Sequence, residues 1–229
     1  VVTAFFLALQ IMSNHVQMSY YFLFVILFIA GAYFEDAWRN KTLPRFFKAS
    51  AVLLVAALIG VAANLSNLYH TYTYSKETMR GKSELVQTGD AAKQTSSGLD
   101  RDYITNWSYG IGETWTLLVP NFKGGSSSAP LSQSETAMEK ANPMYGSLYN
   151  SFPQYFGSQP WTAGPVYVGA FVLFLFVLGC FIVKGPLKWA LLGATFFSIV
   201  LAWGKNFMPL TDFFIDYVPM YNKFRAVSS

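Results

Sequence analysis

The chain has 229 residues, of which 53% are hydrophobic, 18% aromatic and only 12% charged, with a formal charge of +4. Soluble globular domains carry roughly 25% charged residues. Together with a mean hydropathy of +0.31, this composition argues against an ordinary cytosolic enzyme or a disordered regulator. The distribution of charge also does not fit a nucleic-acid-binding protein, which would carry a concentrated basic face. The single cysteine, Cys180, excludes an internal disulfide and a multi-cysteine zinc site.

Uncharged apolar runs near both ends of the chain approach the length that crosses a bilayer. A spanning helix needs about 20 mostly apolar residues, since each adds ~1.5 Å against ~30 Å of hydrocarbon. Backbone groups in lipid must be satisfied within their own segment, so helices are expected. We predict an all-α membrane protein, a polytopic transmembrane helix bundle, with three helices in residues 1–68 and a helix pair in residues 164–203. The individual runs are 1–12, 16–34, 49–68, 164–183 and 189–203.

Both ends of the sequence look incomplete. The chain does not begin with methionine, the first run has only about twelve residues, and no closing element follows residue 225. We therefore expect an internal piece of a longer membrane protein.

Basic residues indicate the side of the membrane on which the loops lie. The loop at 184–188 has two lysines and no acid, and the loop at 35–48 contains Arg39, Lys41, Arg45 and Lys48. The positive-inside rule predicts that both loops are cytoplasmic. The segment 69–163 is then extracytoplasmic, as is the amphipathic stretch 204–229, which would lead to a further helix.

The segment 69–163 is too long for a structureless loop, so we expect a mixed, mostly helical or irregular structure. Residues 88–99 and 120–130 are rich in Gly and Ser and are predicted to be mobile. Asp100 is a candidate cap for a short helix that follows it. Residues 134–142 favour one or two helical turns. Residues 144–161 carry several aromatic rings and are typical of a surface at the lipid headgroups.

Three polar clusters could bind a ligand on the extracytoplasmic face. His15 and Gln17 lie where a helix enters the membrane, and could line a cavity or belong to an interfacial belt. Asp102, Trp107 and Glu113 alternate acids with aromatic rings, a combination that suits sugar binding but also fits a capped helix followed by a packed turn. Lys223 and Arg225, with Lys205, run against the positive-inside bias. They could bind the phosphate of a lipid-linked donor or extend to lipid headgroups.

Metal and nucleotide chemistry find little support. Only His70 could join His15 as a metal ligand, and nothing in the sequence brings them together. Walker, dinucleotide-binding and Gly-x-Ser-x-Gly motifs are absent. No cofactor is identifiable, and the sequence leaves dependence on a divalent metal open.

Residues 13–21, 107–125 and 221–226 resemble the YfhO family of bacterial multispanning membrane proteins. That family is similar in architecture to GT-C glycosyltransferases, which take a sugar from a polyprenyl-phosphate carrier outside the cytoplasm. The resemblance implies the bacterial cytoplasmic (inner) membrane. It also implies a catalytic acid upstream of Val1, so no residue here receives that role. His15 and Gln17 would face the cavity, and Arg225 would contact the donor phosphate.

We therefore expect a membrane glycosyltransferase-like protein that transfers a sugar from a polyprenyl-phosphate carrier to a cell-envelope acceptor. The expected partners are membrane lipids, the lipid-linked sugar, and a glycopolymer, lipid or protein acceptor, without nucleic acid. Two alternatives stay open: a transporter or flippase of a lipid-linked precursor, and a noncatalytic membrane scaffold.

Overall fold

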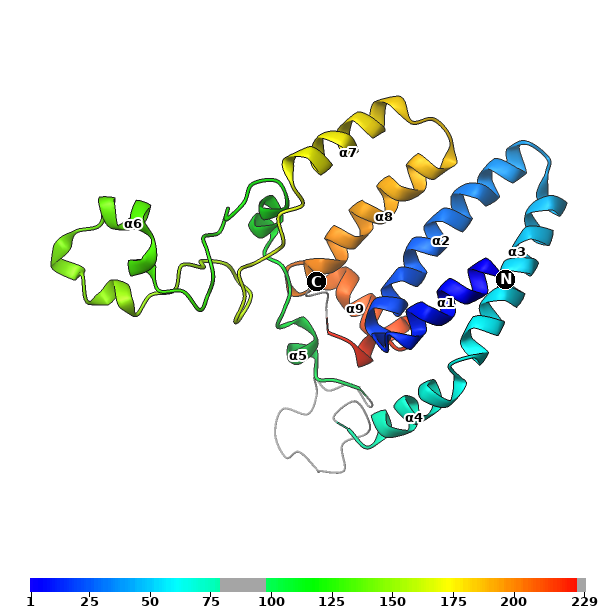
Figure 1. Cartoon of the computed structure of the whole chain (residues 1–229), viewed down its shortest axis with the longest axis horizontal. Coiled ribbons are helices and arrows are strands. Elements are labelled where there is room, and N and C mark those ends of the chain that lie inside the picture. The colour runs from blue at the N-terminus through cyan, green and yellow to red at the C-terminus, as the bar shows by residue number, and fades with distance from the viewer. Residues whose placement is uncertain (79–97, 226–229) are drawn as a thin grey trace. The chain divides into compact units, whose positions relative to one another are not determined.

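The computed structural model describes residues 1–78 and 98–225, and these residues are mainly helical (Figure 1). They contain no strand, only two isolated antiparallel bridges, Gly124 with Tyr155 and Pro130 with Pro153. The described residues divide into two compact units. The first comprises 1–78, residue 98 and 179–197, and the second comprises 99–178 and 198–225. Most of the predicted mobile loop at 88–99 lies outside the described residues.

The first unit begins with four helices in succession, shown from blue to cyan in Figure 1. Two of them, α2 and α3, are long and apolar enough to span a membrane. The predicted runs at 1–12 and 16–34 are confirmed as helices, and α2 continues beyond its run to an Arg39–Glu35 ion pair in its last turns. The helices are α1 (Val2–Met12), α2 (Val16–Arg39), α3 (Leu43–Ala62) and α4 (Leu65–Lys76).

The predicted run at 49–68 was wrong as a single helix, because α3 ends at Ala62 and α4 begins at Leu65. Near this break, α3 packs closely against α1. A Cβ at Gly60 would lie 2.9 Å from the carbonyl oxygen of Ala4, so a larger residue would push the helices apart. The Asn64 amide nitrogen also donates to the carbonyl oxygen of Ala8 at 3.0 Å.

The predicted helix at 164–183 was wrong at its start, since α7 spans only Ala170–Ile182. Gly164 and Gly169 have φ values of +78° and +95°, outside the right-handed helical region. Pro165 lies between them and has no N–H to donate to a helix. Hydropathy alone could not detect this interruption. The remaining 13 residues measure about 20 Å along the helix axis, less than the hydrocarbon thickness.

The predicted run at 189–203 corresponds to α8 (Pro186–Ala202), which is followed by a 3-10 turn, η6 (Gly204–Phe207), and α9 (Met208–Tyr217). The chain bends by 107° between α8 and the segment that carries η6 and α9. Together, α8, η6 and α9 are long and apolar enough to form one broken membrane span or a re-entrant loop. Residues 204–217 are thus a helical continuation of α8 after a sharp turn.

The second unit contains short helices joined by irregular chain. Asp100 caps α5 (Arg101–Thr105), because its side chain accepts hydrogen bonds from the backbone N–H groups of Asp102 and Tyr103. This confirms the predicted cap. The predicted turns at 134–142 are confirmed by α6 (Glu135–Lys140). The remaining elements are the 3-10 turns η2 (Ile111–Leu117), η3 (Leu131–Gln133), η4 (Pro143–Tyr145), η5 (Leu148–Asn150) and η7 (Tyr221–Lys223).

The prediction that residues 120–130 are mobile was wrong, because this segment is bonded to residues 152–162. Backbone N–H groups of Gly125 and Ser127 donate to the carbonyls of Gln154 and Thr162, at 3.1 and 3.0 Å. In the opposite direction, the Gln154 N–H donates to the carbonyl of Ala129 at 2.9 Å. The glycines and serines therefore permit close backbone pairing rather than disorder.

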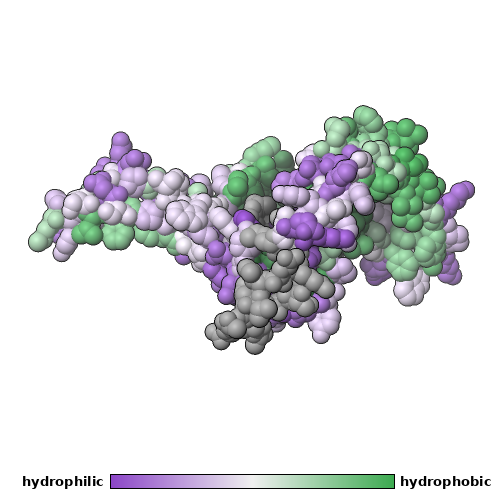
Figure 2. All heavy atoms as spheres, turned by 90° about the horizontal axis from the view of Figure 1, so that it is seen from below, coloured by the Kyte–Doolittle hydropathy of each residue, from purple (hydrophilic) through white to green (hydrophobic). Residues whose placement is uncertain are grey.

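The second unit has a small core that draws on both of its chain segments. Ile104 and Tyr221 are fully buried, and the other buried hydrophobic residues of this unit are Leu99, Tyr109, Tyr155, Val200, Leu201, Ala202, Phe214, Ile215 and Phe224. In Figure 2, hydrophobic surface gathers over the long helices, whereas the segment that carries α6 is mostly hydrophilic or neutral.

Candidate functional site

Two segments that lie about 100 residues apart in the sequence are joined by hydrogen bonds in the second unit. The backbone N–H of Leu99 donates to the carbonyl of Asn222 at 2.9 Å, and that of Tyr109 donates to the carbonyl of Ala202 at 2.8 Å. The Lys205 N–H donates to the hydroxyl of Ser108 at 2.9 Å. The acidic and aromatic cluster and the C-terminal cationic cluster, predicted separately, are therefore part of one structure.

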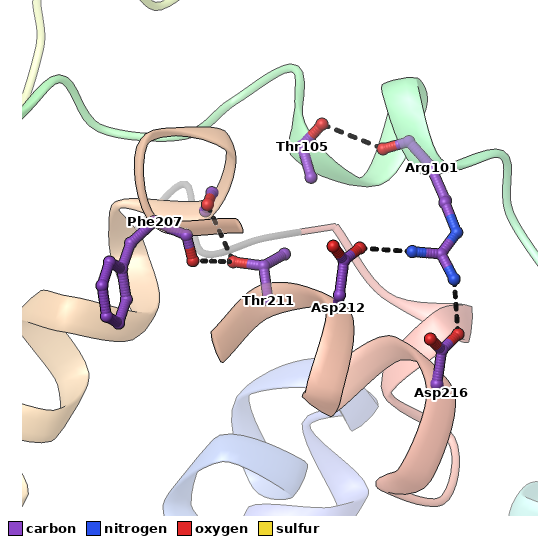
Figure 3. Close-up of polar contacts among 7 residues, drawn as sticks. Arg101, Thr105, Phe207, Thr211, Asp212 and Asp216 are labelled. Carbon is purple, nitrogen blue, oxygen red and sulfur yellow. Dashed lines mark hydrogen bonds and ion pairs between the residues drawn. The ribbon is translucent and has the colours of Figure 1, made fainter. Parts of the chain in front are cut away.

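An ion-pair clamp fastens α5 to α9 (Figure 3). The two terminal nitrogens of Arg101 donate separately to the carboxylates of Asp212 and Asp216. The two acids lie four residues apart, so they occupy the same face of α9. Sequence reasoning missed this clamp. Its signal was the (i, i+4) acidic pair, which required a basic partner from elsewhere in the chain.

A pocket of about 300 Å³ opens in this unit and combines aromatic, amide and guanidinium groups. Trp107 and Arg225 were predicted to bind a ligand, and they come from the two hydrogen-bonded segments. A third segment, which contains Gln159 and Trp161, was not predicted to contribute to the site. The lining residues are Trp107, Tyr109, Gln159, Trp161, Thr162, Gly164, Val166 and Arg225.

Arg225 is held against two aromatic rings at one side of the pocket. Its guanidinium carbon lies 4.7 Å from the ring centroid of Tyr103 and 5.8 Å from that of Trp107. One of its nitrogens also donates to the Tyr103 hydroxyl. Stacking on aromatic faces is favourable for arginine, whose guanidinium is more weakly hydrated than an ammonium group. These contacts orient a permanent positive charge at the pocket wall.

Gln159 supplies a buried amide to the same pocket. Its side chain is 5% exposed, and its Nε2 donates to the carbonyl oxygen of Trp107 at 2.6 Å. Its backbone N–H donates to the Tyr155 hydroxyl at 3.3 Å. Among the described residues, the amide oxygen has no hydrogen-bond donor. Gln159 lines the pocket, so this oxygen can accept a hydrogen bond from a bound molecule.

Glu113 is buried beside this wall and holds it together. The carboxylate is 1% exposed and accepts hydrogen bonds from the N–H groups of Gly110 and Ser158, both at 2.6 Å. The Tyr155 hydroxyl donates to the same carboxylate. A Cβ at Gly157 would overlap both Glu113 and Tyr155, so only glycine fits there. Glu113 thus connects residues 110–113 with residues 155–158.

Burial around Glu113 suppresses ionisation of the neighbouring phenols. Burial first, and the hydrogen bond to Glu113 second, raise the pKa of Tyr155 far above its usual value. Burial, followed by the charge of Glu113, also raises the pKa of Tyr109. Both phenols stay protonated at neutral pH, which lets Tyr155 donate its proton to the carboxylate while its oxygen accepts from Gln159.

The other predicted ligand residues do not line this pocket. Asp102 is exposed on α5, and Glu113 makes protein contacts with both carboxylate oxygens. Lys223 is half-buried, and burial lowers the pKa of its ammonium group. His15 and Gln17 belong to the first unit. There, His15 Nδ1 accepts a hydrogen bond from the backbone N–H at the start of α2, and Gln17 lies in the first turn of that helix.

The described residues contain no group of three or more His, Cys, Asp or Glu side chains that could hold a metal ion. Carboxylates are likewise missing from the described lining of the pocket. The arrangement can bind an anionic group at Arg225, stack a ring on tryptophan and accept a hydrogen bond from a hydroxyl group at Gln159.

Comparison of the chain with protein-family models, with curated proteins and with solved structures finds no match.

Proposed function

We propose that the pocket lined by Trp107, Trp161, Gln159 and Arg225 binds the sugar phosphate of a polyprenyl-phosphate-linked donor, and that the protein transfers this sugar to a cell-envelope acceptor. The observation that carries the proposal is the meeting of a guanidinium, aromatic faces and a buried amide in one pocket. Arginine makes bidentate contacts with phosphate, and neutral rings with amides are suited to the C–H faces and hydroxyls of a sugar.

Trp161 supports this assignment by its conformation and exposure. Its side chain is 88% exposed although it lines the pocket, and its φ of +56° lies in the left-handed region. A non-glycine residue in that region costs about 1–3 kcal/mol and is retained mostly at functional sites. A bound sugar would cover the exposed indole.

The reaction would be a displacement at the anomeric carbon. A hydroxyl oxygen of the acceptor forms the new bond to that carbon while the bond to the donor phosphate oxygen breaks. The polyprenyl phosphate leaves with the electron pair, and Arg225 stabilises its negative charge. A general base takes the hydroxyl proton, and it would come from outside the described lining. The proposal includes membership of the YfhO family, which is similar in architecture to GT-C enzymes.

The proposal includes a multi-pass topology in a bacterial cytoplasmic membrane, with residues 69–163 on the extracytoplasmic side. The candidate spans α2 and α3 support membrane insertion, and the basic loops support the orientation. His15 and Gln17 are also proposed to line a cavity, and Asp102 and Lys223 to contact the ligand, although none of the four lines the pocket described above.

A transporter or flippase of a lipid-linked precursor is the second candidate. Discontinuous helices line the binding sites of many transporters, and the 107° bend between α8 and the segment of η6 and α9 is such a feature. A noncatalytic scaffold is the third alternative, and it requires neither sugar transfer nor lipid movement.

Sugar transfer from synthetic short-chain polyprenyl-phosphate sugars, measured with the full chain in lipid nanodiscs, tests the proposal. Arg225→Ala should reduce transfer at least tenfold, and Arg225→Lys should restore part of it. Lys140→Ala is the matched control, because Lys140 is exposed on α6 and does not line the pocket. Transfer that is equal in all three variants would remove the site assignment. Translocation of a fluorescent polyprenyl phosphate across vesicles, without any transfer, would favour the flippase.

A further inference from the structure

The turn η2 is amphipathic in the opposite sense to a helix on a water-soluble protein. It buries Glu113 and Thr116, which are 1% and 4% exposed. It exposes Ile111 and Trp115, which are 56% and 55% exposed. A helix of a protein in water instead buries its apolar side chains and exposes its polar ones, because buried polar groups cost free energy and exposed apolar surface is unfavourable.

The exposed apolar side continues beyond the turn into the residues that follow. We define the 111–122 face by its five exposed apolar side chains, which are Ile111, Trp115, Leu118, Val119 and Phe122. The face spans η2, a 3-10 turn that ends at Leu117, and the irregular residues that follow it. Within this face, the rings of Trp115 and Phe122 lie 6.5 Å apart between centroids. The face is thus one surface rather than a set of scattered side chains.

The 111–122 face is joined to the entrance of an apolar helix in the same unit. The N–H of Val168 donates to the carbonyl oxygen of Leu117 at 3.2 Å, and α7 begins two residues after Val168. None of the 13 residues of α7 is buried by the described protein, and all of them are apolar or glycine. In Figure 1 the green turn lies next to the yellow start of α7.

We propose that the 111–122 face lies in the interfacial layer of the bilayer at the point where α7 enters it. Three features favour lipid as the occupant. The face is continuous with a helix whose surface is apolar, it carries a tryptophan, and Lys123 follows it directly. Tryptophan is enriched at membrane interfaces, and lysine can extend its ammonium group to the headgroups. The inference does not depend on the ligand of the pocket.

Lipid contact at this depth also accounts for the place of Glu113. A carboxylate on the outer side of η2 would lie among the exposed apolar side chains and would lose its hydrogen bonds to the protein. Turned inward, it accepts three hydrogen bonds from the protein. One orientation of η2 therefore supplies hydrogen bonds to the Glu113 carboxylate and also presents the apolar side chains to lipid.

Site-specific fluorescence in reconstituted vesicles tests this placement. The native cysteine is removed with Cys180→Ala, and single cysteines at Leu118→Cys and Val119→Cys carry the environment-sensitive dye NBD in the full chain. Thr136→Cys is the matched control, because Thr136 is exposed on α6 in the same unit. The vesicles contain phosphatidylethanolamine, phosphatidylglycerol and lipids with a nitroxide near the headgroup.

Dye at positions 118 and 119 should emit at shorter wavelength and be quenched severalfold more by the nitroxide lipid than dye at position 136. Quenching by aqueous iodide should show the reverse order. Equal iodide quenching at all positions would overturn the proposal, since the face would then be in water. Protection from both quenchers would also overturn it, because a protein partner or a second copy would then cover the face. Ile111→Cys is a further position on the face, so the result does not rest on one pair of sites.

Discussion

Replacement of Glu113 by glutamine should loosen the wall of the pocket without changing its shape. The carboxylate accepts three hydrogen bonds, two at one oxygen and one at the other. A glutamine can keep its carbonyl oxygen toward Tyr155 and Ser158, but its NH₂ group then faces the N–H of Gly110. Two donors oppose each other, and the Gly110 N–H has no acceptor.

The cost follows from these three contacts. A buried donor without an acceptor costs about 1–3 kcal/mol, and each of the two remaining bonds loses about 1 kcal/mol when its acceptor is no longer charged. Glutamine is uncharged, so the variant no longer has the free-energy cost of burying the charged carboxylate, and this gain offsets part of the loss. We expect a net loss of about 3 kcal/mol in the local free energy of opening, or about a hundredfold change in the opening equilibrium.

Hydrogen exchange measured by mass spectrometry on the full chain in detergent provides the assay. In Glu113→Gln, peptides that contain Gly110 and Ser158 should exchange about a hundredfold faster than in the parent protein. Glu139→Gln is the control, because Glu139 is exposed on α6. Exchange within threefold of the parent in Glu113→Gln would refute the argument that this carboxylate holds the two segments together.

Three further changes test neighbouring parts of the same unit. Arg101→Met should destabilise the docking of α5 on α9 by roughly 1–2 kcal/mol, a modest value because its carboxylate partners are about two-fifths exposed. Thermal unfolding should show a lower melting temperature for this variant, with a smaller difference from the parent in high salt. A melting temperature equal to that of the parent at low salt would contradict the prediction. Gly157→Ala should destabilise more than Glu113→Gln, because the added Cβ would overlap the side chains of Glu113 and Tyr155 and displace all their hydrogen bonds, and equal or greater stability would show that these side chains can move aside. For Tyr155, the raised pKa means that the folded state keeps its proton after the unfolded chain has lost it, so stability should fall as the pH rises above about 10. Tyr155→Phe should be less stable than the parent at neutral pH yet lose less stability between pH 9 and pH 11, and parallel curves would exclude Tyr155 as the titrating group.

The local features of this protein could be predicted because nearby residues decide them. The cap at Asp100 depends on the next three residues, and the helix α2 follows from an apolar run of the required length. The beginning of α7 was misplaced because hydropathy treats Val166 and Val168 like helical residues. Gly164 and Gly169 have positive φ values, so the helix begins only after Gly169.

The candidate site depended on contacts between distant segments. Trp107 and Arg225 were predicted to bind a ligand, and both line the pocket, although nothing in their spacing showed that they would meet. Gln159 and Trp161 were missed because their segment looks like an aromatic surface until it pairs with residues 123–131.

Composition and apolar run length are properties of the chain alone, and they were enough to predict helices of the length and composition that can cross a membrane, as α2 and α3 have. Whether Glu113 would face a ligand or the protein interior was not such a property. An acid beside aromatic rings is compatible with either orientation, and the choice depends on donors about 45 residues away in the sequence. The free energy of those hydrogen bonds exists only after the segments have packed, so it leaves no periodic signal in the sequence.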